Sequence, residues 1–201
     1  MIKRLFDISF ASTVLLGLGP LLFGVAALIK FTSPGPMFYC GERVGLRGRR
    51  FRIFKFRTMV VDADKLGGSS TAEDDPRITR IGQLLRRYKL DELPQFLNVL
   101  RGEMSVVGPR PQVAWAVDLY TPEQRRLLDV RPGITDYASI KFRDESEILR
   151  GAADPDRVYL ERIAPEKIRL GLEYVNQRSF WTDLRIIAMT VVASARPGKE
   201  F

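Results

Sequence analysis

Hydrophobic residues are concentrated at the start of the chain, where residues 8–29 include no charged side chain. A helix over this stretch would be about 33 Å long, comparable with the hydrocarbon core of a bilayer. Gly17, Gly19 and Pro20 interrupt it near the middle. Proline lacks a backbone donor and clashes with the carbonyl four residues earlier, so Gly19 and Pro20 predict a kink. The pattern therefore predicts a bent apolar helix within residues 1–32.

Basic residues flank this apolar stretch on both sides. Lys3 and Arg4 precede it, Lys30 follows it, and several arginines lie between residues 43 and 50. The positive-inside tendency favours keeping both flanks on the cytoplasmic side, as in a re-entrant hairpin. A Pro-kinked helix that spans the membrane is the open alternative. A secretory signal peptide fits poorly. Its apolar region is usually about 7–15 residues long, which is shorter than residues 8–29, and the small-residue cleavage site that should follow is not found here.

The remainder, residues 33–201, has the pattern of one compact domain that is mainly helical. Residues 37–44 and 51–58 are expected to form two strands of a small β-hairpin, joined by a Gly-containing turn. Apolar residues at helical spacing predict a helix over 77–88, and Pro94, tolerated in a first turn, predicts a second helix from about Asp91. Residues 62–76 are expected to form a polar loop, and 145–177 and 179–196 to be largely helical. The last helix is either a core helix or an amphipathic helix at a membrane interface.

Charge and composition narrow the chemistry. The chain has 201 residues and a net charge of +8, which favours an anionic partner, although such a charge also serves solubility. It contains no histidine and one cysteine, Cys40. This excludes a Ser-His-Asp triad and metal sites built on imidazole. Carboxylates, lysine, tyrosine or water must then carry any acid–base chemistry.

The strongest candidate for chemistry is the adjacent pair Asp91 and Glu92, at the predicted start of a helix. Helix starts favour anions, and an ionised aspartate can attack phosphorus or bind a metal ion. A simple helix cap is the alternative, and taken alone it is the commoner role. Arg57, Arg86 and Arg110 are candidates for holding phosphate oxygens. Without histidine, the metal that fits best is Mg²⁺ on carboxylate oxygen, with Asp91 as its ligand.

Six motifs in this order add a resemblance to a known family. They are Lys55-Phe56-Arg57-Thr58-Met59, Asp75-Pro76-Arg77, Leu90-Asp91-Glu92-Leu93-Pro94-Gln95, Asn98-Val99-Leu100-Arg101-Gly102-Glu103-Met104-Ser105, Gly108-Pro109-Arg110-Pro111 and Arg131-Pro132-Gly133-Ile134-Thr135. Together they resemble the bacterial monotopic phosphoglycosyl transferases, the bacterial sugar transferase family. The resemblance runs from Lys3 to Leu184.

The resemblance implies a fold, a location and a two-step reaction. The fold would be a re-entrant membrane helix over 1–32 and a catalytic domain over 33–201, with interfacial amphipathic helices on the cytoplasmic face of the bacterial inner membrane. Asp91 would attack the β-phosphate of a UDP-sugar and release UMP, and the phosphosugar would then pass to a polyprenyl phosphate, typically undecaprenyl phosphate. Glu92 would deprotonate the acceptor or help to place Mg²⁺, and Arg57, Arg86 and Arg110 would hold phosphates. Inner-membrane lipid is an expected partner and nucleic acid is not, while a homodimer and the identity of the sugar stay open.

The chain departs from the family pattern at three places. Gly19-Pro20 stands where many members have Ser-Pro, so a hydroxyl is missing at the kink. Asp136-Tyr137-Ala138-Ser139 stands where many have Gly-Leu-Ala-Gln, which changes the expected sugar and nucleotide contacts. Gly171 replaces a frequent aspartate.

Three other functions compete with sugar transfer. A non-catalytic basic protein that binds anionic lipid or nucleic acid at a membrane surface accounts for the charge but leaves the Asp91–Glu92 context unexplained. A lipid kinase would need an ATP-binding loop, and the sequence has no such motif. A purely structural anchor would not require arginines near a carboxylate pair.

Overall fold

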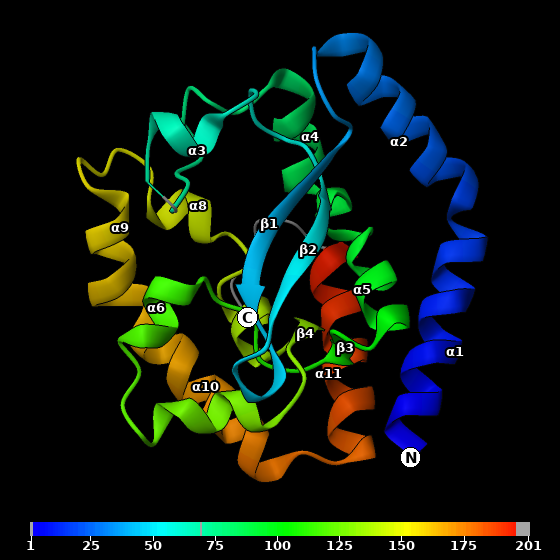
Figure 1. The fold of residues 1–201 in the computed structure, drawn as a ribbon, viewed down its shortest axis with the longest axis vertical. Helices are drawn as coiled ribbons and strands as arrows, with labels where there is room; N and C mark the ends of the chain where they lie inside the picture. The colour runs from blue at the N-terminus through cyan, green and yellow to red at the C-terminus, as the bar shows by residue number, and fades with distance from the viewer. Residues whose placement is uncertain (1, 69, 196–201) are drawn as a thin grey trace.

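A computed structural model of the protein describes residues 2–68 and 70–195. Helices α1 (Ile2–Gly17) and α2 (Gly19–Thr32) run along one edge of the molecule, and the hairpin of β1 (Phe38–Val44) and β2 (Arg50–Phe56) crosses its middle (Figure 1). The start of helix α11 (Phe180–Ala195) lies beside the start of α1, where the rings of Phe6 and Phe180 are in contact. The prediction of a mainly helical fold with a small antiparallel hairpin is therefore confirmed.

Most of the other elements are short, and α10 is the longest of them. They are η1 (Leu46–Gly48), α3 (Ala63–Leu66), α4 (Arg80–Arg87), η2 (Leu90–Glu92), α5 (Gln95–Arg101), β3 (Ser105–Val107), α6 (Ala114–Asp118), η3 (Gln124–Asp129), β4 (Gly133–Thr135), α7 (Tyr137–Lys141), α8 (Glu145–Ile148), α9 (Pro155–Val158), η4 (Tyr159–Ile163) and α10 (Ala164–Gln177). Strands β3 and β4 pair in parallel, with Ser105 opposite Gly133 and Val107 opposite Thr135. The two carboxyl ends therefore meet at one edge of this small sheet.

One boundary differs from the sequence-based expectation in a way that matters for the site. The helix expected from Asp91 begins only at Gln95, and Asp91 lies in the preceding 3₁₀ turn, η2. Pro94 explains the difference, because within a helix from residue 91 its ring would crowd the carbonyl of Leu90. Asp91 is thus held by a tight turn and is not the cap of α5.

The N-terminal helix is interrupted at Leu18, beside Gly19 and Pro20, and α1 and α2 are bent by 63° from each other. Pro20 lies in the first turn of α2, where its missing N–H leaves no helical bond unmade. Among the residues that the structure describes, no single helix is long and apolar enough to cross a membrane. The bent pair passes that test only when its two helices are taken together.

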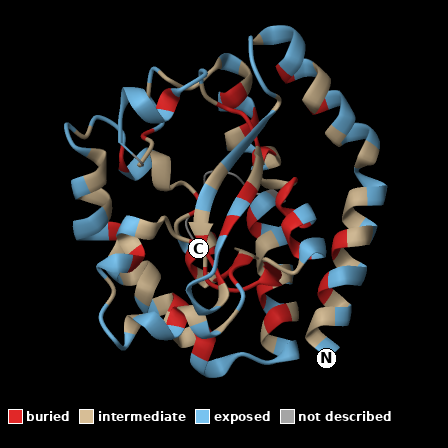
Figure 2. Ribbon diagram, in the orientation of Figure 1, coloured by how far each residue is buried: buried red, intermediate tan, exposed pale blue. Residues whose placement is uncertain are grey.

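The two helices pack differently against the body. Ala11 of α1 is fully buried in the main hydrophobic core, together with Phe96, Val99 and Ile186. Helix α2 contributes the buried Val25 and Ile29 and the partly buried Leu22 and Ala26 to a smaller cluster, and most of its surface is exposed or half-buried (Figure 2). The exposed apolar side chains of the pair are Ile2, Leu5, Ile8, Leu16, Leu18, Leu21, Phe23, Leu28 and Phe31.

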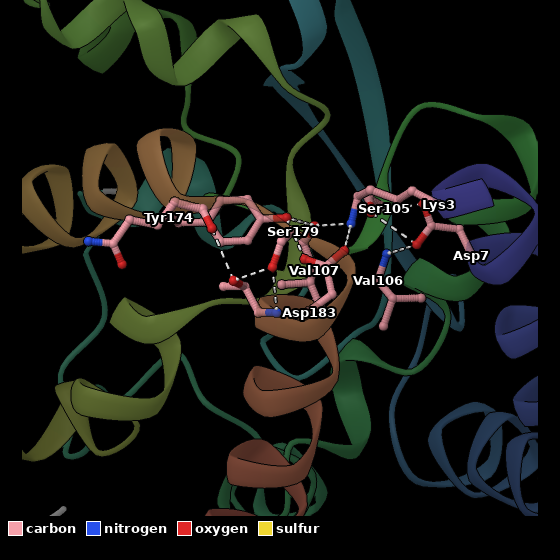
Figure 3. Close-up of polar contacts among 10 residues, drawn as sticks. Lys3, Asp7, Ser105, Val106, Val107, Tyr174, Ser179 and Asp183 are labelled. Carbon is pink, nitrogen blue, oxygen red and sulfur yellow. Dashed lines mark hydrogen bonds and ion pairs between the residues drawn. The ribbon is translucent and has the colours of Figure 1, made fainter. Parts of the chain in front are cut away.

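Buried polar contacts attach α1 to strand β3. Asp7 is only 2% exposed, and its carboxylate accepts hydrogen bonds from the Ser105 hydroxyl at 2.9 and 3.0 Å and from the Val106 N–H at 3.0 Å (Figure 3). Arg4 donates to the carbonyls of Val99, at 2.6 Å, and Leu100, at 3.0 Å. A charged residue inside this helix is therefore satisfied by the domain and does not face outward.

A second buried aspartate ties α1 to α11. Asp183 accepts hydrogen bonds from Lys3 at 2.5 Å and from the Tyr174 hydroxyl at 2.8 Å, and both donors also reach the carbonyl of Val107, at 3.2 and 3.1 Å (Figure 3). Burial and the neighbouring Asp183 carboxylate raise the pKa of Tyr174, so its hydroxyl keeps its proton and acts as a donor. The first turns of α1, strand β3, α10 and the start of α11 thereby form one connected unit.

Asp183→Ala is expected to lower the free energy of unfolding by about 2 kcal/mol, because it removes a charged acceptor and leaves Tyr174 with one partner. Denaturant unfolding in detergent measures this. Asp118→Ala, at an exposed aspartate on α6, is the matched control and should change stability by less than about 0.5 kcal/mol. Equal losses in the two variants would contradict a stabilising role for the Lys3–Asp183–Tyr174 contacts.

Candidate active site

Asp91 is a buried carboxylate with an unused acceptor atom. It lies in the turn η2, between α4 and α5, and this turn begins directly after Lys89, whose backbone is left-handed with φ of 55°. Asp91 is 6% exposed, and within the described part of the chain its Oδ1 has no hydrogen-bond partner. Buried polar atoms are normally paired, so this oxygen is free to take part in chemistry or to bind a cation.

Glu92 is held by two basic side chains from different parts of the fold. Lys55 of β2 donates to its Oε1 at 2.8 Å, and the terminal nitrogens of Arg110 contact both carboxylate oxygens, with Nη1 3.1 Å from Oε2. Arg110 follows strand β3 in the Gly108-Pro109-Arg110-Pro111 turn. The two-point contact fixes the plane of the guanidinium beside the carboxylate pair.

The two carboxylates differ in charge preference. Burial, reinforced by the adjacent Glu92, raises the pKa of Asp91. Burial also opposes the ionisation of Glu92, but the charges of Arg110 and Lys55 outweigh it and hold the pKa of Glu92 well below its usual range. Glu92 is thus a fixed anion. Burial disfavours the ionised form of Asp91, and a further positive charge nearby would favour it.

Two of the three predicted arginines lie near Asp91 and Glu92 in the structure. Arg110 contacts Glu92 directly, and Arg86 of α4 lies close enough that its charge lowers the pKa of Asp91. The Nε of Arg86 donates to the Thr58 hydroxyl at 2.9 Å. Burial lowers the pKa of Arg86, and Asp91 partly offsets this effect.

The third predicted arginine, Arg57, makes its hydrogen bonds to the turn after α2 and not to the carboxylate pair. Its Nη2 donates to the Ser33 carbonyl at 3.0 Å and to the Ser33 hydroxyl at 2.9 Å, and its Nη1 donates to the Pro34 carbonyl. These atoms belong to the turn that follows α2. Here Arg57 joins that turn to the end of the hairpin, and its proposed phosphate contact stays a prediction.

Lys55 is a basic residue of the site that sequence reasoning did not single out, although it lies in the first of the six motifs. Its position two residues after Ile53, which is buried, could have indicated that Lys55 faces the interior. Alternate residues of a strand share a face, so Lys55 points the same way as a core residue. Its side chain reaches Glu92 and is itself mostly buried.

Close backbone packing sets the position of Arg86. A Cβ on Gly82 of α4 would lie 1.9 Å from the Thr58 carbonyl oxygen, so only glycine lets the helix approach this strand end. Gly82→Ala is expected to cost about 2 kcal/mol or more, in the upper part of the range for overpacking. Gly24→Ala, where a Cβ meets nothing within 4 Å, is the control and should be neutral or slightly stabilising. Thermal unfolding of both variants checks this, and an unchanged Gly82→Ala melting temperature would contradict the close approach.

A cavity of about 270 Å³ lies next to Arg110. It is lined by residues from three segments, 109–127, 136–139 and 159–168, and Arg110 belongs both to its wall and to the contact with Glu92. The described residues contain no group of three or more His, Cys, Asp or Glu side chains able to hold a metal ion. A cation at Asp91 would therefore need oxygen ligands beyond an acidic cluster, such as those of a substrate or of water.

Comparison with known proteins identifies the family. The chain matches the family described as "Bacterial sugar transferase" over residues 1–197. It is 41% identical to the exopolysaccharide production protein PSS of Rhizobium leguminosarum bv. phaseoli, covering 100% of this chain and 98% of that protein.

Two longer relatives carry more specific names. The chain is 40% identical to an undecaprenyl-phosphate glucose phosphotransferase of Komagataeibacter xylinus and 37% identical to the UDP-glucose:undecaprenyl-phosphate glucose-1-phosphate transferase of Escherichia coli (strain K12). The matches cover 94% and 95% of this chain but 35% and 39% of those proteins, so it spans less than half of their length. The protein belongs to the bacterial sugar transferase family.

Proposed function

We propose that this protein transfers a phosphosugar from a UDP-sugar to a polyprenyl phosphate, undecaprenyl phosphate in bacteria, giving a polyprenyl-diphosphate-sugar and UMP. The observation that carries the proposal is the buried carboxylate of Asp91, whose Oδ1 is unpaired, beside a Glu92 that is clamped by Lys55 and Arg110. The names of the relatives, which act on undecaprenyl phosphate with glucose or N-acetylgalactosamine phosphates, support the substrate class.

The reaction uses Asp91 twice. An oxygen of Asp91 attacks the β-phosphorus of the donor, and the bond between that phosphorus and the bridging oxygen breaks, so that UMP leaves with the electron pair. A phosphate oxygen of the acceptor then attacks the same phosphorus, and the bond to Asp91 breaks. Both steps place negative charge near Arg86 and Arg110, whose planar guanidinium groups suit phosphate oxygens.

Mg²⁺ is the proposed cofactor, and it would neutralise diphosphate charge during the transfer. The fit rests on the unpaired Oδ1 of Asp91, a hard oxygen ligand in a site without histidine. Mg²⁺ commonly takes one or two carboxylates and completes its shell with substrate phosphates and water. A site without a larger acidic cluster agrees with that pattern.

The geometry favours a holding role for Glu92 over a general-base role. A base works best when its pKa lies near the working pH, and Lys55 and Arg110 keep the pKa of Glu92 far below it. A phosphate monoester has its second pKa near 6 and is already largely ionised at neutral pH, so little deprotonation is needed. We infer that Glu92 orients Lys55 and Arg110 toward the substrate phosphates.

For the membrane segment we propose a re-entrant pair, with the catalytic domain on the cytoplasmic face of the bacterial inner membrane. The 63° bend, the exposed apolar residues of α1 and α2, and the inward-facing contacts of Asp7 support it. Single cysteines at Ile2 and Pro36, both exposed, test it in a Cys40→Ser background. Gly35 is avoided because its φ of 106° and the nearby Arg57 leave no room for a side chain. Labelling both positions from the cytoplasmic side is expected, and labelling from opposite sides would show a spanning helix.

The activity is tested with detergent-purified protein, undecaprenyl phosphate, Mg²⁺ and a panel of UDP-sugars, with released UMP as the readout. At least one donor is expected to yield UMP, and chelation of Mg²⁺ is expected to stop its release. Salt-sensitive binding of anionic vesicles without UMP from any donor would favour the alternative, a basic membrane-surface binding protein.

A further inference from the structure

We propose that the cavity beside Arg110 takes the sugar ring of the donor, and that Asp136 determines sugar specificity by accepting hydrogen bonds from its hydroxyl groups. This inference rests on the proposed function. It assigns a role to a residue at which this chain departs from the common Gly-Leu-Ala-Gln pattern of its family.

The topology places the cavity next to the reacting phosphate. Strands β3 and β4 are parallel, so the chain leaves both at the same edge. Arg110 follows β3 and Asp136 follows β4, and a hydrogen bond from the Gly108 N–H to the Thr135 carbonyl joins the two exits. The charge of Arg110 reaches Asp136 and lowers its pKa, and both residues line the cavity. Arg110 then contacts Glu92, the neighbour of Asp91. A diphosphate held by Arg110 would therefore have the cavity at its side.

The size of the cavity suits one ring. Its volume of about 270 Å³ is slightly below the range of roughly 300–1,000 Å³ that is typical of drug-sized ligand sites. It has room for a sugar ring or for a nucleoside, but not for a whole nucleotide-sugar. Its walls are largely apolar, and the polar side chains among them include Arg110, Asp136, Ser139, Tyr159 and Lys167.

Asp136 combines burial with remaining acceptor capacity. It is 2% exposed, and its Oδ1 accepts the N–H of Ser139 at 2.6 Å, which caps α7. The Ser139 side chain also lies within hydrogen-bonding range of this carboxylate. A carboxylate has about four acceptor positions, so capacity remains for a ligand, and Asp136 lines the cavity. Burial raises the pKa of Asp136, although the hydrogen bonds from Ser139 and the charges of Arg110 and Lys167 act in the opposite direction.

The chemistry of this acceptor favours a sugar. A carboxylate accepts hydrogen bonds from hydroxyl groups, and a hexose presents several of them around an apolar ring face. Uracil offers a single N–H between two carbonyl oxygens, so a carboxylate that accepts from this N–H would also meet the two flanking acceptor oxygens. Tyr159 forms an aromatic part of the cavity wall. Lys167 lies over its ring at 5.1 Å and pairs with Glu145, and these contacts hold the ring in place.

The test is Asp136→Asn, with Asp154→Asn as the matched control. Asparagine is as good a helix cap as aspartate, so α7 is expected to stay intact while the charge is lost. Asp154 caps α9 in the same way, by accepting the Arg157 N–H at 3.0 Å, but lies outside the cavity. The readouts are kcat/KM for UDP-sugars that differ at single positions, such as UDP-glucose, UDP-galactose and their N-acetylated counterparts, and the Kd of UMP.

Asp136→Asn is expected to lower kcat/KM for the preferred donor by roughly 10-fold or more and to reduce the ratio between epimeric donors, since hydrogen bonds to charged groups carry such discrimination. The Kd of UMP should stay within about 2-fold of the wild type, and Asp154→Asn should change neither. Unchanged donor ratios would overturn the inference, as would weaker UMP binding, which would place the ribose at Asp136. If the wild type releases no UMP from any donor, the proposed function itself fails, a result distinct from either of these.

Discussion

Asp91→Asn is expected to reduce UMP release by more than about 10³-fold, the scale of loss when a catalytic nucleophile is removed. The amide keeps the size and position of the side chain but cannot form the bond to phosphorus. Loss of UMP release with retained binding of the donor would distinguish this effect from loss of the site. Full activity of Asp91→Asn would contradict the nucleophile assignment.

The same substitution should leave the protein at least as stable as the wild type at pH 7. Burial raises the pKa of Asp91, so its contribution to folding is favourable below the ordinary aspartate pKa and is lost as the pH rises through the raised value. At neutral pH the buried charge is therefore a cost, and a neutral amide removes it. Thermal unfolding at pH 7 measures this, with Asp118→Asn at an exposed site as control. A lower melting temperature for Asp91→Asn alone would mean that Asp91 has a structural role.

The sequence was informative where local chemistry decides the structure. Two strand-like segments joined by a Gly-containing turn predicted the hairpin, and the break near Pro20 followed from the missing proline donor. The motifs selected Asp91, Glu92 and Arg110 from separate segments, and the structure places the last two in direct contact.

Tertiary contacts decided the rest. Whether Arg57 reaches a phosphate or the turn at Ser33 depends on where α2 ends relative to the hairpin, and no local pattern encodes that. Lys55 is equally ambiguous from the sequence, because a lysine beside a core residue can turn to solvent or find a buried anion. The exit of β4 at Asp136 became part of the site only through the parallel pairing with β3.

Glu92→Ala is expected to destabilise the protein by about 3 kcal/mol, at the lower end of the range for removing one partner of a buried ion pair. The substitution leaves Lys55 and Arg110 facing each other without the anion that separates them. Burial already lowers the pKa of Lys55 and Arg110 lowers it further, while Glu92 works against both effects. Kinetically, a less ordered Arg110 should raise KM for the donor as well as lower kcat.

The matched control is Glu42→Ala, which breaks a pair with Arg50 at 2.9 Å on the exposed face of the same hairpin. Such surface pairs contribute at most about 1 kcal/mol. The pH dependence separates the two sites further: the pKa of Glu92 is held below the usual glutamate value, so its contribution is present above that value and lost as the pH falls through the lowered one. The stability difference between wild type and Glu92→Ala should therefore shrink in acid. If denaturant unfolding gave Glu42→Ala and Glu92→Ala the same loss at pH 7, Lys55 and Arg110 would not depend on Glu92, and its proposed holding role would be wrong.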